Sequence, residues 1–404
     1  MPSSPLPSFL ISHFSLLTPR RTSLGILLLL VTSLLALGTG CPAVEQGDFG
    51  LNPFRDLAPL PLDGQPHELA YTIAPLGELA ADQVIRLKAD GPGISAVLLL
   101  AEDDQFEPAG RLAGGGPPGM FFEYRVQIPG RHFVFVLFDP QTPDLLRQAA
   151  LTVMPGEPAF APPDRQQVLV TFDAGFLTGP GLVDPESFSD EEREFMADIA
   201  PIVQEGVVER LRTIFAETPI EILTEGDPPA AAPVSRLAFR AERVLADDDG
   251  TYFDAVLPAG MEDRPECQDK VVFGEVLPRG TMVDPGNHAP DDEAAVYVGS
   301  FQGRGELCRS AAINSVNNII LGLAHTAAHE IGHLVGLYHV PLADIMNRSP
   351  SLAFQRDLTF ARGQMLMEGP TGNWILTTVI QDPDFYFRAN FGPTLHIATL
   401  GSEK

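Results

Sequence analysis

The stretch from His329 to His339 holds the residues best suited to chemistry, spaced as H-E-x-x-H-x-x-G-x-x-H. Four residues bring an α-helix round to nearly the same face, about 6 Å further along its axis, so His329 and His333 can direct two imidazoles at one metal ion. His339 can join them only if the helix ends and the chain turns back, and Gly336 stands where that turn is needed. Three neutral imidazoles suit Zn²⁺ and leave a fourth position for water.

Glu330 directly follows His329 on the helix, so its side chain projects at a different angle from the two histidines. From there it can reach water on the metal without being a ligand. A carboxylate in that place can act as general base while the metal polarises a carbonyl, which is the chemistry of peptide-bond hydrolysis. Such spacing arises by chance on the order of 10⁻⁵ times in a chain of this length. A helix with scattered histidines is the alternative, but four of the nine histidines lie within residues 325–339.

The stretch resembles the metzincin clan of zinc metallopeptidases, and its residues are most similar to those of the matrixin type. Met346, within Ala343–Asn347, matches the Met-turn of that clan, in which a methionine lies beneath the metal. Ordinary core packing is the alternative for Met346. The resemblance covers about residues 310–350, and Asn347-Arg348 departs from the Tyr-Pro that matrixins often carry.

The resemblance implies a zinc endopeptidase with an α+β catalytic domain, built from a twisted mixed sheet, an active-site helix and a small C-terminal subdomain. We place this domain at residues 165–395, with a tail at 396–404. Candidate strands precede a long helix at about 309–336. In metzincins the edge strand above the cleft pairs with extended substrate, and residues 294–301, or the stretch before them, are the candidates here.

The other elements of this domain follow from local patterns. We expect a helix from Ser189 to about Phe215 that Pro201 kinks or divides. We expect a short helix within 356–367 and irregular packing beyond it. The candidate strands are 167–172, 220–224, 236–240 and 271–276.

Residues 67–155 read as short strands separated by Gly and Pro turns, which predicts an all-β sandwich in front of the catalytic domain. The candidate strands are 67–73, 83–88, 94–100, 121–128, 132–138 and 148–153. No catalytic constellation is found in them, so we expect a spacer or an accessory binding module. Residues 156–164 are the predicted linker.

Residues 1–40 are typical of an export signal, with Arg20-Arg21 before an apolar run from Leu24 to Leu37. Gly38-Thr39-Gly40-Cys41 resembles a bacterial lipobox, in which Cys41 becomes lipidated. The prediction is a protein anchored by lipid to the bacterial cell envelope through a tether at 41–66. Ordinary cleavage with secretion, and a retained membrane anchor, are the alternatives.

The remaining cysteines, Cys267 and Cys308, most simply form one disulfide in an exported protein. A Cys267 thiolate that blocks the metal is the alternative. Acidic clusters at 247–250 and 284–293 are typical of solvated turns, and Ca²⁺ binding is the alternative. His325 lies on the same helical face as His329, and we expect an ordinary helix histidine there rather than a residue that supports the metal site.

The formal charge of −27, from 53 acidic and 26 basic residues, disfavours nucleic acid and anionic membrane surfaces as partners. We expect a monomer that acts on a protein or peptide substrate and contacts the membrane only through its lipid. Two other functions stay open: a non-catalytic surface lipoprotein that keeps the zinc fold for binding, and a zinc amidase that acts on cell-wall peptides.

Overall fold

The computed structural model describes residues 57–102, 110–138, 148–157, 165–178, 189–228, 234–245, 253–254, 270–277, 283–284, 286–289, 291–301, 315–347, 353, 358–368 and 374–391. The chain divides into two compact units, Met1–Phe49 and Gly50–Lys404, and every described residue lies in the second. No helix in these segments is long and apolar enough to cross a membrane. The fold is mixed α and β, as the sequence predicts.

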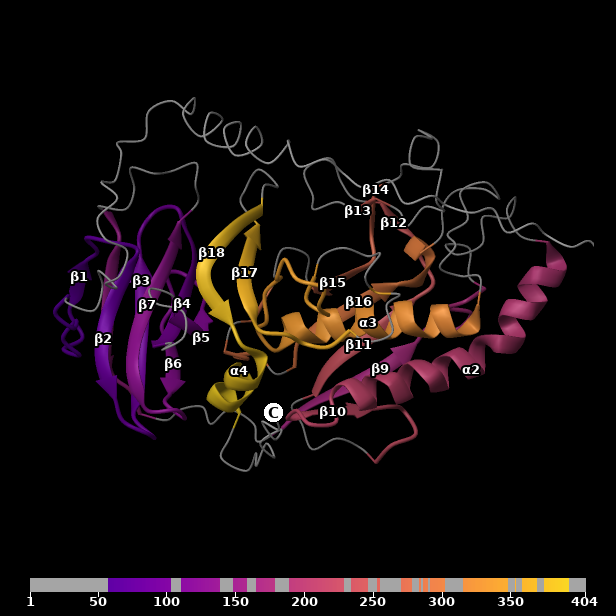
Figure 1. The fold of residues 1–404 in the computed structure, drawn as a ribbon, viewed down its shortest axis with the longest axis horizontal. Coiled ribbons are helices and arrows are strands. Elements are labelled where there is room, and N and C mark those ends of the chain that lie inside the picture. Colours follow the sequence, from indigo (N-terminus) through magenta and orange to yellow (C-terminus); the bar gives the residue numbers. More distant parts are fainter. Residues whose placement is uncertain are drawn as a thin grey trace, which may run out of the picture. The chain divides into compact units, whose positions relative to one another are not determined.

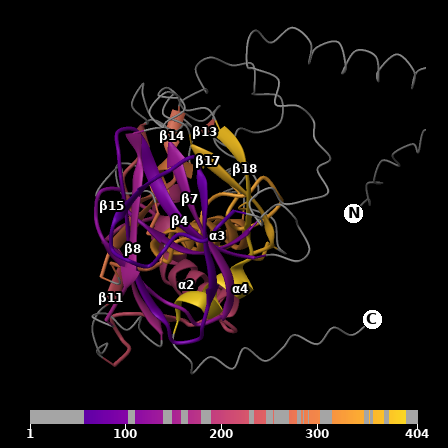
Figure 2. The same ribbon diagram turned by 90° about the vertical axis from the view of Figure 1, so that its left-hand side faces the viewer.

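Two sheets, built mostly from the N-terminal part of the described chain, pack face to face (Figures 1 and 2). The first has the order β1 (Pro66–Glu68), β8 (Ala150–Pro155), β3 (Val84–Asp90) and β6 (Phe122–Arg125). The second has the order β17 (Gly363–Glu368), β18 (Trp374–Gln381), β5 (Gly110–Gly116), β4 (Ile94–Glu102), β7 (Gly130–Phe138) and β2 (Ile73–Leu79).

Strand β4 is buried on both faces, which explains its unbroken apolar run. Val97 and Leu99 belong to the core between the two sheets, whereas Leu98 and Leu100 belong to the core that contains the long helices. Successive side chains of a strand point to opposite faces, so a strand covered on both sides needs no polar alternation. The second sheet is therefore the partition between two hydrophobic cores.

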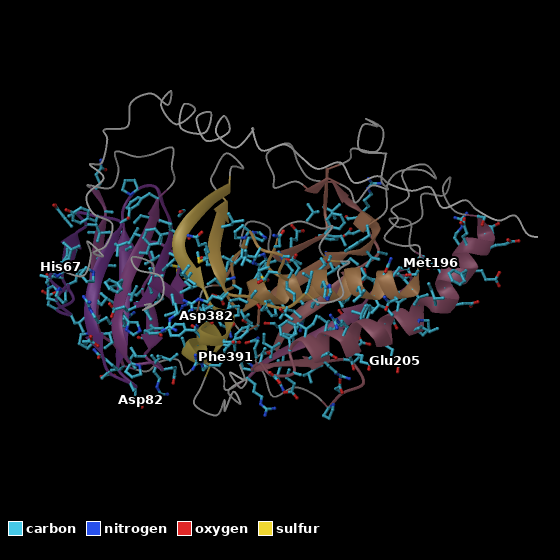
Figure 3. All side chains as sticks on the ribbon, in the orientation of Figure 1. His67, Asp82, Met196, Glu205, Asp382 and Phe391 are labelled. Atoms are coloured by element: carbon cyan, nitrogen blue, oxygen red, sulfur yellow. The ribbon has the colours of Figure 1, made fainter. Side chains whose placement is uncertain are left out.

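Strands β17 and β18 come from the far end of the chain and extend this same sheet (Figure 1). The predicted helix within 356–367 is wrong, because Gly363–Glu368 pairs with β18 as a strand. The predicted irregular packing is also wrong, since β18 pairs in parallel with β5 at Ile380 and Arg111. Partners distant in sequence supply the hydrogen bonds here, and they outweigh local preference. Helix α4 (Pro383–Asn390) follows, with Asp382 as its N-cap (Figure 3).

A second mixed sheet carries the long helices. Its order is β10 (Ile220–Leu223), β9 (Gln166–Phe172), β11 (Val234–Arg240), β16 (Glu293–Tyr297) and β15 (Gly274–Leu277). The first four strands run parallel and β15 runs antiparallel to β16. Helices α2 (Asp190–Ile214) and α3 (Val316–Leu334) pack on it through the larger core. A small sheet joins β12 (Val244–Leu245), β14 (Lys270–Val272) and β13 (Phe253–Asp254).

Several predicted strands end earlier or divide. The predicted strand 294–301 stops at Tyr297 and continues as a 3-10 helix, Val298–Phe301. It is also an inner strand, and the edge strand next to it in the described sheet is β15, in the stretch before it. The predicted strand 271–276 divides between β14 and β15. The predicted strand 67–73 is wrong in most of its length, because the chain turns after β1 and β2 begins only at Ile73.

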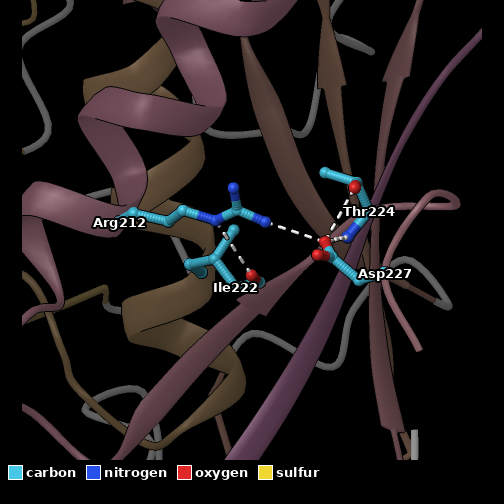
Figure 4. Close-up of polar contacts among 4 residues, drawn as sticks. All are labelled: Arg212, Ile222, Thr224 and Asp227. Atoms are coloured by element: carbon cyan, nitrogen blue, oxygen red, sulfur yellow. Dashed lines mark hydrogen bonds and ion pairs between the residues drawn. The ribbon is translucent and has the colours of Figure 1, made fainter. Parts of the chain in front are cut away.

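Helix α2 begins at a capping box, in which Ser189 and Glu192 exchange side-chain and backbone hydrogen bonds. Pro201 lies inside the helix and does not divide it. At its other end, Arg212 donates to Asp227 (2.7 Å), and Asp227 also accepts from the backbone and hydroxyl of Thr224 (Figure 4). These contacts fix the end of α2 to the loop that follows β10.

Candidate metal centre and catalytic site

The carboxyl end of α3 reverses the chain toward the face of the helix that carries His329 and His333. Gly336 has a φ of 97°, which side-chain-bearing residues rarely adopt. The Leu337 N–H donates to the Gly332 carbonyl (2.8 Å) and the Gly336 N–H donates to the His333 carbonyl (3.0 Å). These two bonds define a Schellman motif. The turn therefore returns His339 to the histidines of the helix.

Three ring nitrogens meet at one point. The Nε2 atom of His329 lies 3.0 Å from the Nε2 atoms of both His333 and His339, and the last two are 3.3 Å apart. Nitrogen ligands bound at zinc distance in a tetrahedral site lie about 3.3 Å from one another. Within the described segments, these histidines form the one group of three or more His, Cys, Asp or Glu side chains arranged to hold a metal ion.

Backbone carbonyl groups orient two of the rings. The Nδ1 atom of His329 lies 2.7 Å from the Ile345 carbonyl, and that of His333 lies 2.7 Å from the Leu337 carbonyl. A carbonyl oxygen can only accept, so both Nδ1 atoms carry hydrogen and both Nε2 atoms present lone pairs. Lone pairs 3.0 Å apart repel one another unless a cation lies between them. The donor set thus fits a metal ion such as Zn²⁺.

Burial keeps these two rings neutral. It lowers the pKa of His329 to about 4 and that of His333, which also lies beside His329, to about 3. Neutral imidazole is the form that binds a metal, so the site is ready for a cation at neutral pH without first losing protons.

Glu330 lies on the same helix, with its side chain against strand β15. The residue is only 5% exposed. Burial and the neighbouring charge of Glu275 raise the pKa of Glu330 to about 8. A Cβ atom on Gly274 would lie 2.5 Å from the Glu330 Oε1 atom, so the carboxyl fits because this strand position has no side chain. The helix that carries His329 and His333 therefore also carries a buried carboxyl that can exchange protons.

Met346 lies against α3 between the two helical histidines. Its side chain is fully buried, and a Cβ atom on Gly332 would lie 2.4 Å from its Sδ atom. The turn is held by Asp344, whose carboxylate accepts hydrogen bonds from the backbone N–H groups of Met346 and Ala361. Burial raises the pKa of Asp344 to about 6 in spite of those bonds. Because the adjacent Ile345 carbonyl binds the His329 ring, this turn also orients a candidate metal ligand.

His325 lies outside the triad. It is buried, its Nδ1 atom lies 2.7 Å from the Ala353 carbonyl, and its Nε2 atom lies 3.3 Å from the Arg210 guanidinium. Burial is the main cause that lowers its pKa. His325 therefore connects α2 to α3 within the core.

The acidic stretch 284–293 is tied into the mixed sheet, apart from two residues outside the described segments. Asp284 accepts from the Ala289 N–H (2.7 Å), and Asp292 accepts from the Ser235 hydroxyl (2.6 Å). Burial, followed by the charges of Asp284 and Asp291, raises the pKa of Asp292 to about 7. Calcium binding by this stretch stays a prediction. Several predicted features lie outside the described residues: the export signal 1–40, Cys41, the cluster 247–250, Cys267, Cys308 and the tail 396–404.

Four residues that contact the site or the backbone beside it were not predicted from the sequence: Gly274, Gly332, Asp344 and Gln381, whose side-chain amide bonds to the Tyr338 backbone. An isolated glycine within a helical pattern indicates close packing, so Gly332 could have been found from the sequence. Gln381 carries no such signal, because its hydrogen-bond partner Tyr338 lies 43 positions earlier.

No family model and no curated protein matches the sequence. Among solved structures, the chain is similar to an archaemetzincin from Archaeoglobus fulgidus complexed with malonate, with a TM-score of 0.24 and 14% identity, covering 48% of this chain and 95% of that one. It is also similar to an archaemetzincin from Methanopyrus kandleri, with a TM-score of 0.24 and 12% identity, covering 49% of this chain and 89% of that one. At this TM-score the likeness assigns neither fold nor function.

Proposed function

We propose that this chain is a zinc-dependent endopeptidase, exported and anchored to the bacterial cell envelope through a lipid on Cys41. One observation carries the hydrolytic part: three Nε2 atoms lie 3.0–3.3 Å apart beside the buried carboxyl of Glu330. A zinc ion held by His329, His333 and His339 would lower the pKa of water and polarise a peptide carbonyl.

Glu330 performs the proton transfers. As a carboxylate it takes a proton from the attacking water, and as a carboxylic acid it gives that proton to the nitrogen of the departing amine. Its buried position limits competition from bulk water for the proton, and Gly274 leaves it room beside β15. The free carboxyl and amine products then leave the site.

The edge strand supports a peptide as substrate. β15 ends the described sheet, and Gly274 within it approaches Glu330. An extended peptide can add to such an edge through backbone hydrogen bonds, which brings its own carbonyl groups close to the base. This arrangement favours an endopeptidase over the cell-wall amidase and over the non-catalytic binding lipoprotein.

The first test is zinc content together with cleavage of unfolded casein, on residues 42–404, with and without a chelator. We expect one zinc ion per chain and cleavage that the chelator abolishes and added zinc restores. Bound zinc without cleavage of casein or other unfolded proteins would contradict the endopeptidase and favour the amidase or the binding lipoprotein. A chain that takes up no zinc would contradict the metal centre.

The anchor is tested separately in bacterial cells. The full chain should fractionate with membranes and incorporate labelled fatty acid, and Cys41→Ala should lose both properties. Unchanged membrane association of the variant would contradict the lipid anchor.

A further inference from the structure

A buried glutamine holds the backbone next to the third histidine. Gln381 ends β18, directly before Asp382, which is labelled in Figure 3, and it is 0% exposed. Its Oε1 atom accepts from the Tyr338 N–H (2.6 Å), and its Nε2 atom donates to the Tyr338 carbonyl (2.7 Å). One side-chain amide thus satisfies both backbone groups of the residue that precedes His339.

The other strand of the same hairpin binds the next residue. The Leu366 N–H in β17 donates to the His339 carbonyl (2.7 Å), and these two residues form an isolated antiparallel bridge. Consecutive residues, Tyr338 and His339, are therefore held by β18 and β17 in turn. His329 and His333 differ, because helix α3 fixes their spacing.

We infer that Gln381 is a positioning residue for the third metal ligand. The inference rests on the proposed metal centre. His339 follows the turn at Gly336 and has no helix to set its place. Loss of the Gln381 amide leaves the Tyr338 N–H and carbonyl without these buried partners. The segment that contains Tyr338 and His339 would then shift to regain hydrogen bonds. A metal tolerates little displacement of a ligand, and groups that hold ligands typically affect metal affinity 10–100-fold.

The chain offers a matched control in Gln166. This glutamine is also buried, at 1% exposure, and its amide also bonds on both sides. It donates to the Ser235 hydroxyl (2.7 Å) and accepts from the Asn287 amide (2.8 Å). None of these contacts involves a candidate ligand or its neighbours in sequence. Replacing either glutamine by methionine removes the same amide from a buried position with little change in volume.

The experiment compares the wild-type full chain with Gln381→Met, Gln381→Asn and Gln166→Met. The measurements are zinc affinity by chelator competition, the visible spectrum after Co²⁺ substitution, and the midpoint of thermal unfolding. We expect Gln381→Met to weaken zinc affinity by about 10–100-fold and to alter the Co²⁺ spectrum. Gln166→Met should lower the unfolding midpoint and retain the affinity and spectrum of the wild type.

Gln381→Asn keeps a polar amide that is one methylene too short to reach both Tyr338 groups, so it should also weaken zinc affinity. It serves as the test if the methionine variant does not fold. Folded Gln381 variants with wild-type affinity and spectrum would overturn this inference alone. Equal losses in Gln166→Met would overturn it too, because they would indicate general destabilisation. A wild-type chain that binds no zinc would overturn the proposed metal centre itself.

Discussion

At the scale of single residues, the site depends on which nitrogen of each ring carries hydrogen. The carbonyl groups of Ile345 and Leu337 each take an Nδ1 hydrogen, so the Nε2 atoms of His329 and His333 point their lone pairs at one place. Glu330 stands beside them with its proton affinity raised by burial. Metal binding and proton transfer are thus assigned to different side chains, which substitutions can separate.

Glu330→Gln removes the proton acceptor and keeps the shape of the side chain. We expect zinc content to stay at the wild-type level and the rate of casein cleavage to fall by at least about 10²-fold, since general base catalysis typically contributes 10²–10⁴-fold. Metal analysis and initial rates on the same preparation make the comparison. Cleavage at the wild-type rate would show that Glu330 is not the base.

His339→Ala should differ from Glu330→Gln, because it removes a candidate metal ligand and should therefore lower zinc affinity itself. We expect zinc affinity to fall well below that of Glu330→Gln, and activity to fall with it. Chelator competition measures the affinity directly. If His339→Ala retains wild-type affinity, the metal is held by other groups.

At the scale of elements, helix α3 packs closely against the turn that carries Met346, because Gly332 has no side chain at the contact. Gly332→Ala would place a Cβ atom 2.4 Å from the Met346 Sδ atom and 3.4 Å from the Phe360 ring. Overpacking of this kind costs about 1–3 kcal/mol, against a gain of about 1 kcal/mol in helix propensity. We expect a lower unfolding midpoint in a thermal scan, and the double variant Gly332→Ala with Met346→Ala should lose less stability than the sum of the two single losses. A Gly332→Ala protein more stable than wild type would show that Met346 has room to move.

The edge strand β15 is tested by Gly274→Ala. A Cβ atom there would overlap the Glu330 carboxyl, with its Oε1 atom at 2.5 Å. We expect zinc content to be unchanged and the cleavage rate to fall, because the base is displaced and the histidines are not. Cleavage at the wild-type rate would indicate that Glu330 acts from a different position.

Prediction from sequence succeeded where function or local pattern dominates. The spacing of His329, His333 and His339 predicted that their rings meet at one point, and the alternation and turns predicted five strands of the first two sheets, β3, β4, β6, β7 and β8. It failed for Gly363–Glu368 and Trp374–Gln381, whose partners are each other, β5 and the His339 segment. No local signal reveals such partners, because strand pairing is decided by residues far along the chain.

At the scale of the whole molecule, strand β5 contacts several segments that are distant from it in sequence. The His288 Nε2 atom lies 2.7 Å from the Gly115 carbonyl, and the Asn390 amide donates to the Ala113 carbonyl (2.8 Å). The Arg111 guanidinium lies 4.1 Å from the centre of the Phe385 ring. These contacts and the shared sheet attach the N-terminal strands to the part of the chain that carries the candidate metal centre.

Acid should destabilise the protein through buried histidines, of which His132 is the simplest to isolate. Its Nδ1 atom lies 2.9 Å from the Gly130 carbonyl, and burial lowers its pKa. The folded ring stays neutral while the unfolded chain takes up a proton below about pH 6.5, so this contribution to stability is present above that pH and is lost as the pH falls.

His132→Asn keeps a donor for the Gly130 carbonyl and removes the titration. Urea unfolding at pH 8 and at pH 5.5 should show a smaller loss of stability for the variant than for the wild type. The difference is at most about 1.4 kcal/mol per pH unit for one proton. The other buried histidines remain in both proteins and give a common background. Equal losses would contradict the assignment of His132.

The hydrogen bonds from Gln381 and Leu366 to Tyr338 and His339 also affect when the candidate metal centre can form during synthesis. The chain is synthesised from its N-terminus, so the three histidines are made before the hairpin β17–β18. Tyr338 forms its hydrogen bonds to Gln381 only after a further 43 residues have been added. During synthesis, the unfinished chain would lack the hydrogen bonds that Gln381 and Leu366 make to Tyr338 and His339. Under the proposed function, full metal affinity, and the hydrolysis that depends on it, would then be reached only after this hairpin has folded.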